Sequence, residues 1–262
     1  MTRRPVRRAA VVTHGKPETI GDARRRLERL LDARGAELVE LDAAPDVAVV
    51  LGGDGTMLRA LRGLLGTGIP VFGVNFGRVG FLTSVEASDL ETGVGRMLAG
   101  EYRIAELATL AVEVGGRSQP AINDAVAASG RLGRMVELGW EIGGEDLGSQ
   151  HCDGIICSTP SGSTAYNLSN GGPVLMWGID AMAITFVAPH SLHARPLVVP
   201  RGTDVRITNR TPDVPVAVLA DGHEVGELEP SASLRVGLAE PRSLLALLPE
   251  ITFFTRYHEV FP

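Results

Sequence analysis

Apolar runs alternate with amphipathic stretches through the first hundred residues of the chain. Residues 9–13 form a short apolar run, and residues 18–34 follow with apolar side chains repeated at helical spacing until Gly35. The same rhythm predicts strands at 37–41, 46–51 and 69–74 and helices at 56–65 and 89–98. Alternating strands and helices are typical of a parallel sheet with helices on both faces, so we expect an α/β N-terminal domain over residues 1–100.

The pattern changes near residue 100, where the helical spacing gives way to short β-like runs. Turn residues separate these runs roughly every 8–12 positions, as in sandwiches and barrels. The predicted strands are residues 108–114, 121–128, 135–142, 154–158, 183–188, 197–199, 204–208, 216–219 and 233–237. One helix is expected to start near Ser163. We therefore predict an all-β C-terminal domain over residues 101–240, with the apolar, aromatic tail 241–262 packing back on the first domain.

Composition excludes several classes of protein. The 262 residues are 44% hydrophobic and 21% charged, which is ordinary for a globular protein, and no apolar run is long enough to span a membrane. The net charge of −6 argues against nucleic acid as the main partner, and the arginines near the N-terminus are read as a solvated flank. The two cysteines, Cys152 and Cys157, lack a zinc-site spacing and are expected to be buried free thiols. We expect a cytoplasmic protein.

The first motif with chemical content is residues 51–58, which read LGGDGTML between a hydrophobic strand and a helix. Its glycines let the backbone approach a ligand closely, and the helix N-terminus that follows favours anions such as a phosphate chain. Asp54 is a poor phosphate ligand by itself, but it could accept a proton from an attacking hydroxyl or hold Mg²⁺ near the phosphates. The alternative is a tight turn in which Asp54 caps the helix.

Two further segments place polar residues after predicted strands. Residues 73–82, GVNFGRVGFL, bracket a polar tip with glycines at the carboxyl edge of the predicted sheet, where ligands of parallel sheets bind. Residues 152–169, CDGIICSTPSGSTAYNLS, carry six Ser/Thr hydroxyls and suit a base, a ribose or a phosphate. A capped helix start would explain only one of these hydroxyls. Asn123-Asp124 and Asp221-Gly222-His223 resemble turns when taken alone.

Taken in order and at these separations, the motifs GGDGTML, GxxGFL, DG…STPSGSTAYNLSNGGP and RPLVVP resemble those of the NAD kinases, in particular the short bacterial form. STPSGSTAY is the most specific of them, because lipid kinases and phosphofructokinases have a loop similar to GGDGT. The resemblance implies an α/β domain, a β-rich NAD-binding domain and an active site between them. It implies that Asp54 accepts the proton of the adenosine 2′-hydroxyl of NAD.

The resemblance also implies which residues bind the substrates. Gly55 and Arg59 would lie by the phosphates, Phe81 would line the adenosine pocket, and Asp153 would reach a neighbouring subunit's ligand. The full set of candidate nucleotide-binding residues is Gly53, Asp54, Gly55, Thr56, Arg59, Phe81, Asn123, Asp124, Asp153, Ser161, Thr164, Ala165, Tyr166, Ser169, Ala188 and Asp221. No residue is assigned as a metal ligand.

One departure from the family pattern concerns its Asn-Glu pair, which reads Asn123-Asp124 here. The carboxylate is shorter by one methylene, so its ribose contact would be weakened or made through water. The expected activity is an NAD kinase that uses ATP or polyphosphate with Mg²⁺ or another divalent metal, in a homodimer or homotetramer. The alternatives are a GGDGT-type lipid kinase, similar to diacylglycerol kinase, and a non-catalytic NAD-binding sensor.

Overall fold

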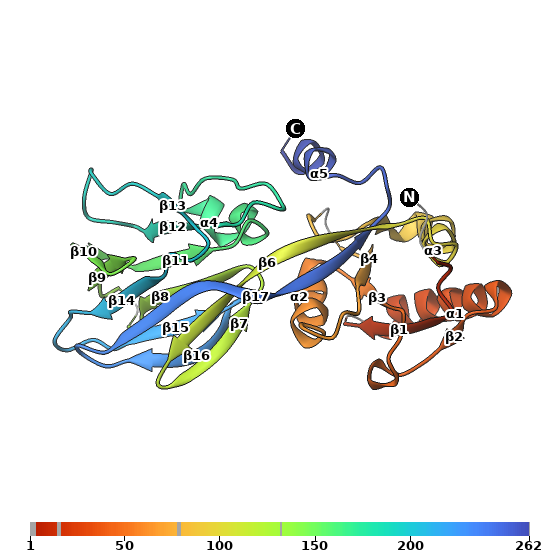
Figure 1. Cartoon of the computed structure of the whole chain (residues 1–262), viewed down its shortest axis with the longest axis horizontal. Helices are drawn as coiled ribbons and strands as arrows, with labels where there is room; N and C mark the ends of the chain where they lie inside the picture. Colours follow the sequence, from red (N-terminus) through yellow and green to blue (C-terminus); the bar gives the residue numbers. More distant parts are fainter. Residues whose placement is uncertain (1–3, 15–16, 78–79, 132, 262) are drawn as a thin grey trace. The chain divides into compact units, whose positions relative to one another are not determined.

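A computed structural model describes residues 4–14, 17–77, 80–131 and 133–261, without the side chains of residues 17–19. The chain divides into two compact units (Figure 1). Unit 1 contains the residues up to Glu106 together with those from Ser243 onward, and unit 2 contains Leu107–Arg242. Within the described residues, no helix combines the length and the apolar character needed to cross a membrane.

Unit 1 is built on a parallel sheet in the order β17-β4-β3-β1-β2, with β5 on β4. Its strands are β1 (Arg8–Thr13), β2 (Glu37–Leu38), β3 (Val47–Gly52), β4 (Val71–Asn75), β5 (Val85–Glu86) and the end of β17 (Ser233–Leu247). Its helices are α1 (Pro17–Arg34), α2 (Asp54–Gly63), α3 (Leu90–Leu98) and α5 (Phe253–Val260), with 3₁₀ turns at Leu41–Ala43 and Ala87–Asp89. The predicted α/β class of this region is confirmed.

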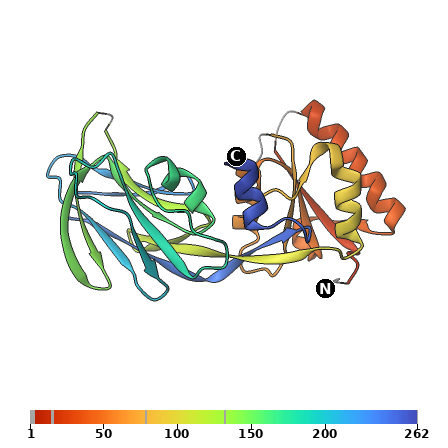
Figure 2. The same cartoon turned by 90° about the horizontal axis from the view of Figure 1, so that it is seen from above.

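Both faces of this sheet are buried, because every residue of β3 is covered. Val47, Val49 and Leu51 belong to the apolar cluster that includes the inner faces of α1 and α3, which lie side by side in Figure 2. Helix α2 packs on the sheet as well, and a Cβ on Gly73 of β4 would lie 2.6 Å from the sulfur of Met57 in α2. The Val/Ala-rich sequence of β3 follows from this double coverage.

The strand order reverses direction between β1 and β3. The chain runs from β1 outward to β2, whereas it runs from β3 in the opposite direction to β4. Such a reversal places a crevice at the carboxyl ends of the two central strands, where open α/β sheets bind their ligands. The residues that follow β1 and β3 are His14 and the loop at Gly53, so the topology marks the GGDG segment as a binding edge.

Unit 2 contains two antiparallel layers. One sheet has the order β13-β12-β11-β8-β15-β16, and the other joins β10-β9-β14 to the start of β17, β6 and β7. The strands are β6 (Arg103–Val114), β7 (Arg117–Ala121), β8 (Asp124–Ser129), β9 (Val136–Ile142), β10 (Glu145–Cys152), β11 (Gly154–Ser158), β12 (Ala181–Val187), β13 (Leu197–Pro200), β14 (Val205–Asn209), β15 (Val216–Ala220) and β16 (His223–Leu228). Side chains of both sheets share one apolar cluster, as in a sandwich, and the all-β prediction is confirmed.

The structure differs from the predicted elements in several places, and the strands β5 and β7 and the helix α5 were not among those predicted. Strands β10 and β16 were not predicted, because β10 has mostly exposed, polar residues and β16 has few buried ones. The helix expected near Ser163 is only a 3₁₀ turn, Gly162–Thr164, followed by the four-residue α4 (Tyr166–Ser169). The strand predicted at 37–41 ends at Leu38. Both cysteines are buried free thiols, as expected.

Candidate functional site

The GGDG loop joins β3 to α2 in unit 1. Helix α2 begins at Asp54, and Gly53 is its N-cap with no capping side chain, so the alternative in which Asp54 caps the helix is wrong. A Cβ on Gly52 would lie 2.5 Å from the Thr56 hydroxyl, so this glycine is required by packing. In contrast, a Cβ on Gly53 or Gly55 would meet nothing within 4 Å. These two glycines therefore present bare backbone to open space at a helix N-terminus, the arrangement that binds phosphate.

The Asp54 carboxylate is held by the loop that carries GxxGFL. The backbone N–H of Phe81 donates to one oxygen at 2.9 Å, and that of Leu82 donates to the other at 3.1 Å. Gly80 passes so close that a Cβ there would lie 2.3 Å from the same carboxylate. Asp54 is half-buried, so the carboxylate is fixed in direction without being sealed in the interior.

Opposing effects act on the ionisation of Asp54. Burial is the largest effect and raises the pKa of the carboxyl, while the hydrogen bonds from Phe81 and Leu82 and the charge of Arg256 act against it. The net pKa lies above the ordinary aspartate value. A carboxylate with a raised pKa and a fixed orientation is a better proton acceptor than an ordinary surface aspartate.

A basic pair lies beside this loop. Arg59 of α2 is exposed, and its guanidinium is 3.1 Å from Nδ1 of His14, the residue that follows β1. The guanidinium has no carboxylate partner among the described residues, so it is available to an anion. Thr56 is different, because its side chain is buried against Gly52. Arg78 and Val79, which belong to the GxxGFL segment, lie outside the described residues.

Phe81 contributes to the site mainly through its backbone. Its ring is buried and packs against Phe253 of α5 and against Phe261, with ring centroids 6.0 and 5.8 Å apart. Its N–H meanwhile binds the Asp54 carboxylate. The resemblance implies that this ring lines the adenosine pocket; the structure shows in addition that the ring packs in an aromatic cluster and that the amide is directed at the acid.

In unit 2, a second carboxylate is held by consecutive amides. Asp221 accepts hydrogen bonds from the backbone N–H groups of Ile122, Asn123 and Asp124, the shortest at 2.7 Å from Asn123. Asp221 and Gly222 have φ of 49° and 76°, and they form the two-residue turn between β15 and β16. The hairpin expected there is present, and its aspartate also fixes the start of β8.

Asp124 lies next to Asp221 and is buried. Burial raises the pKa of the Asp124 carboxyl to about 7, and the negative charge of Asp221 adds to the effect. Within the described part of the chain, no hydrogen bond to the Asp124 carboxylate is found. A protonated Asp124 can donate a hydrogen bond, and an ionised one can only accept, so the hydrogen bonding of this carboxyl group depends on pH.

The hydroxyl-rich segment 158–169 divides into a buried and an exposed set. Ser158, Thr159 and Ser163 are buried, and their hydroxyls bond backbone carbonyls, so they build the loop and cannot meet a ligand. Gly162 fits only because it lacks a side chain, since a Cβ would lie 2.1 Å from the Asn123 carbonyl oxygen. Thr164, Ala165, Tyr166 and Ser169 are half-buried or exposed, and this set remains available for a ligand.

Asn167 is a structural residue that the sequence reasoning missed. Its side-chain amide donates to the carbonyls of Ser163 and Pro173, each at 3.0 Å, and its oxygen accepts from the Thr185 hydroxyl at 2.7 Å. It is fully buried, so it joins the hydroxyl-rich loop to β12. An asparagine inside a predicted helix was the available signal, because this residue is unfavourable there unless its side chain has partners.

The remaining candidates fall into two groups. Asn123, Asp124, Ser161 and Asp221 come together, with the Ser161 hydroxyl 3.4 Å from the Asn123 side-chain oxygen. Asp153 and Ala188 lie at the opposite end of β11, where the Asp153 N–H donates to the Val187 carbonyl at 2.9 Å. Both are exposed, and Ala188 has a left-handed φ of 44°.

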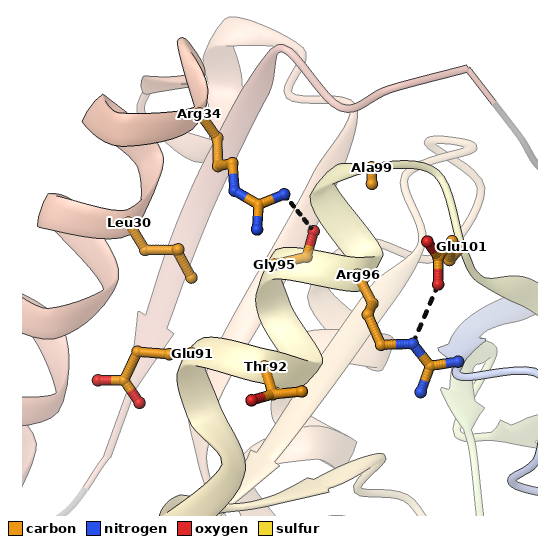
Figure 3. A pocket seen from close by; sticks show the side chains of 8 residues that line it. All are labelled: Leu30, Arg34, Glu91, Thr92, Gly95, Arg96, Ala99 and Glu101. Atoms are coloured by element: carbon orange, nitrogen blue, oxygen red, sulfur yellow. Dashed lines mark hydrogen bonds and ion pairs between the residues drawn. The ribbon is translucent and has the colours of Figure 1, made fainter.

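A hollow elsewhere in unit 1 contains none of the predicted residues. It has a volume of about 430 Å³ between α1 and α3 (Figure 3). Arg34 donates to the Gly95 carbonyl and Arg96 pairs with Glu101 at its edges. These charged groups bind one another or the backbone, so the hollow is not a candidate active site. Among the described residues, no group of three or more His, Cys, Asp or Glu side chains is placed to hold a metal ion.

Comparisons with known proteins agree with this geometry. The family model for the ATP-NAD kinase N-terminal domain matches residues 8–102, and that for the ATP-NAD kinase C-terminal domain matches residues 122–244. An NAD kinase of Gemmatimonas aurantiaca is 41% identical over 240 residues, covering 87% of this chain and 82% of the relative. One of Symbiobacterium thermophilum is 36% identical over 271 residues, covering 94% and 95%.

Two solved structures share the fold. Yeast NADH kinase complexed with NADH gives a TM-score of 0.87 at 20% identity, over 98% of this chain and 88% of that one. An Archaeoglobus fulgidus NAD kinase in complex with ATP gives 0.77 at 23% identity, over 97% of both chains. At these identities the structures establish the fold, while the family models and the curated relatives establish the family. The chain belongs to the NAD kinase family.

Proposed function

We propose that the protein transfers a phosphoryl group to the 2′-hydroxyl of the adenosine ribose of NAD and so produces NADP. The observation that carries this proposal is the Asp54 carboxylate, fixed by two backbone amides beside the open backbone of Gly53 and Gly55. This arrangement offers one proton acceptor and one phosphate-binding helix end within a single loop.

The reaction needs positioning more than covalent chemistry. Asp54 accepts the proton of the 2′-hydroxyl as the 2′-oxygen of the ribose forms a bond to the terminal phosphorus of the donor. The bond from that phosphorus to the bridging oxygen breaks, and the leaving phosphate takes the electron pair. The backbone at Gly53 and Gly55, the N-terminus of α2 and the Arg59 guanidinium steady the phosphates.

The divalent metal fits a site with few carboxylates. Mg²⁺ usually keeps several waters and is bound by one or two carboxylates together with substrate phosphates, and Asp54 is the carboxylate of the GGDG loop. The donor phosphates would therefore hold most of the Mg²⁺ coordination sphere. When bound, the metal neutralises charge that develops on the transferred group.

Unit 2 supplies the proposed NAD contacts. These are the residues around the Asp221 carboxylate together with the exposed part of the hydroxyl-rich loop, namely Asn123, Asp124, Ser161, Thr164, Ala165, Tyr166, Ser169 and Asp221. Asp153 and Ala188 form a separate exposed group, which suits the proposed contact of Asp153 with a neighbouring subunit's ligand in a homodimer or homotetramer. The buried free thiols fit a reducing compartment, and we place the enzyme in the cytoplasm.

An assay of NADP formation tests the function. The purified protein is incubated with Mg²⁺ and NAD, with either ATP or polyphosphate as donor, and the product is identified by its 2′-phosphate in ³¹P NMR. NADH and diacylglycerol serve as alternative acceptors. We expect NADP with at least one donor and no phosphorylated lipid. Phosphatidate as the product, or NAD binding without turnover under these conditions, would instead support the lipid-kinase or sensor alternative.

A further inference from the structure

The segment that holds Asp54 is itself held by the C-terminal part of the chain. Residues Gly80–Thr83 supply both amides that bind the carboxylate, and their backbone continues into Ser84, whose N–H donates to the Gly73 carbonyl at 2.9 Å. The Ser84 hydroxyl donates to the Ala246 carbonyl of β17 at 2.9 Å. One end of the segment is therefore fixed on the sheet of unit 1.

The other restraint comes from α5. Arg256 of this helix is only 4% exposed, and its guanidinium donates to the Thr83 carbonyl and, at 2.6 Å, to Glu259. The ring of Phe81 packs against Phe253 of the same helix. One turn of α5 thus contacts both the backbone and the side chain of the segment that binds Asp54.

A buried arginine lowers the stability of the fold unless its charge and its hydrogen-bond donors have partners. Desolvation of a guanidinium is unfavourable, and a buried donor left without a partner adds to that cost. The Nε of Arg256 is buried without a hydrogen-bond partner in the described structure, as is the hydroxyl of Thr83 beside it. An apolar side chain could fill the same space, so packing alone does not explain the charge of Arg256 or its bond to a main-chain carbonyl.

We propose that Arg256 is a positioning residue for phosphoryl transfer, because its bond to the Thr83 carbonyl fixes the two amides that aim the Asp54 carboxylate. This inference rests on the proposed function of Asp54 as proton acceptor. In this role Arg256 acts through the main chain of Phe81 and Leu82. Its positive charge also favours the ionised form of Asp54.

The test combines hydrogen exchange with kinetics on the full-length protein. In Arg256→Met, we expect faster amide exchange in the peptide that contains Phe81 and Leu82. We expect kcat to fall by about 10²-fold, the usual cost of a misplaced catalytic group, with the KM for NAD changed less than about threefold. Arg256→Lys keeps a charge and a donor, and its kcat should lie between those of the wild type and Arg256→Met.

Two variants of the same helix are matched controls. Glu259→Gln removes the exposed partner of Arg256 and leaves the bond to Thr83 intact, and Phe254→Ala removes a ring that is 64% exposed. Both should leave kcat and the exchange of the Phe81–Leu82 peptide within about twofold of the wild type, as surface substitutions usually do. Circular dichroism and thermal unfolding confirm that each variant is folded.

Each outcome supports or overturns the proposal. Unchanged amide exchange in folded Arg256→Met overturns the proposal, even if kcat is lower. If Arg256→Met does not fold, Arg256→Lys decides: a kcat equal to that of Glu259→Gln overturns the proposal, and an intermediate kcat with faster exchange supports it. A wild-type protein that forms no NADP would refute the proposed function instead, and the exchange data would still report on the contact.

Discussion

Two aspartates of this protein, Asp54 in unit 1 and Asp221 in unit 2, are held in the same way but have neighbours of different charge. Each accepts hydrogen bonds from consecutive backbone N–H groups, those of Phe81 and Leu82 in one case and those starting at Ile122 in the other. The Asp54 carboxylate, however, is influenced by the positive charge of Arg256, whereas Asp221 acts on another carboxylate, Asp124.

The comparison separates orientation from ionisation. Backbone amides fix where a carboxylate points, and they do so equally for a residue that reacts and for one that supports a strand. Burial, modified by the neighbouring charge, then sets the protonation state. At Asp54 the arrangement produces an oriented carboxylate, and at Asp221 it produces a scaffold beside Asp124, whose pKa is raised by burial and further by the charge of Asp221. The predictions below test these two assignments.

The largest effect is expected for Asp54→Asn. The amide side chain is nearly the same size and still accepts a hydrogen bond, but it cannot take up the ribose proton. We expect kcat to fall by about 10³-fold, within the range of general-base removal, with the dissociation constant for NAD changed less than about threefold. Steady-state kinetics and calorimetric titration with NAD measure the two quantities. Near-normal turnover would remove Asp54 from its role.

Gly80→Ala tests the orientation without changing the acid. The new methyl group would overlap the Asp54 carboxylate at 2.3 Å, so either the carboxylate or the loop must move. We expect kcat to fall by about 10²-fold and the free energy of unfolding to decrease by about 1–3 kcal/mol. Gly63→Ala, at a position in α2 with open space around it, is the control and should leave kcat unaltered.

Asp221→Asn should affect stability and NAD binding more than turnover. Only one oxygen remains to accept the amides of residues 122–124, so we expect a loss of about 1–3 kcal/mol in the free energy of unfolding. The KM for NAD should rise severalfold while kcat changes little, because the strand start that carries Asn123 is loosened. Asp213→Asn, at an exposed site before the other end of β15, serves as the control in urea unfolding. A fall confined to kcat would contradict the scaffold assignment.

Asp124→Asn is expected to change the pH dependence of stability. The folded-state pKa of Asp124, about 7, lies above the unfolded value, so the native state binds the proton more tightly. The free energy of unfolding therefore falls as pH rises from about 4 to about 7, by about 1.4 kcal/mol for each pH unit in which the two states differ. Urea unfolding at pH 5 and pH 8 should show a smaller difference in the variant. An equal difference in both proteins would contradict the assignment.

Much of this architecture can be predicted from the sequence, because it depends on local patterns. The buried strand β3, the glycine loop and the helix after it follow from apolar runs and turn residues, and the GGDG loop identifies Asp54 as the reactive candidate. The turn at Asp221 was also recognisable, since Asp-Gly favours two-residue hairpins. What these patterns have in common is that their physical cause lies within about ten residues.

The partners of these groups could not be predicted, because they come from distant segments. The amides that bind Asp54 lie 27 and 28 residues away, and those that bind Asp221 lie 97 to 99 residues away. A sequence shows that Phe81 is aromatic but not that its amide binds the Asp54 carboxylate. The apolar, aromatic tail is expected to pack on the first domain, but its sequence does not show that Arg256 is one of the buried residues.

The pH dependence of a single turnover tests the central claim most directly. Wild-type protein saturated with NAD and ATP is followed through one round of NADP formation as a function of pH, and the ionisation of Asp54 is measured independently by ¹³C NMR. We predict that the rate rises with the deprotonation of Asp54 and then levels off, and that Asp54→Asn shows a slow rate without this step. A wild-type rate that stays constant while Asp54 titrates would contradict the account.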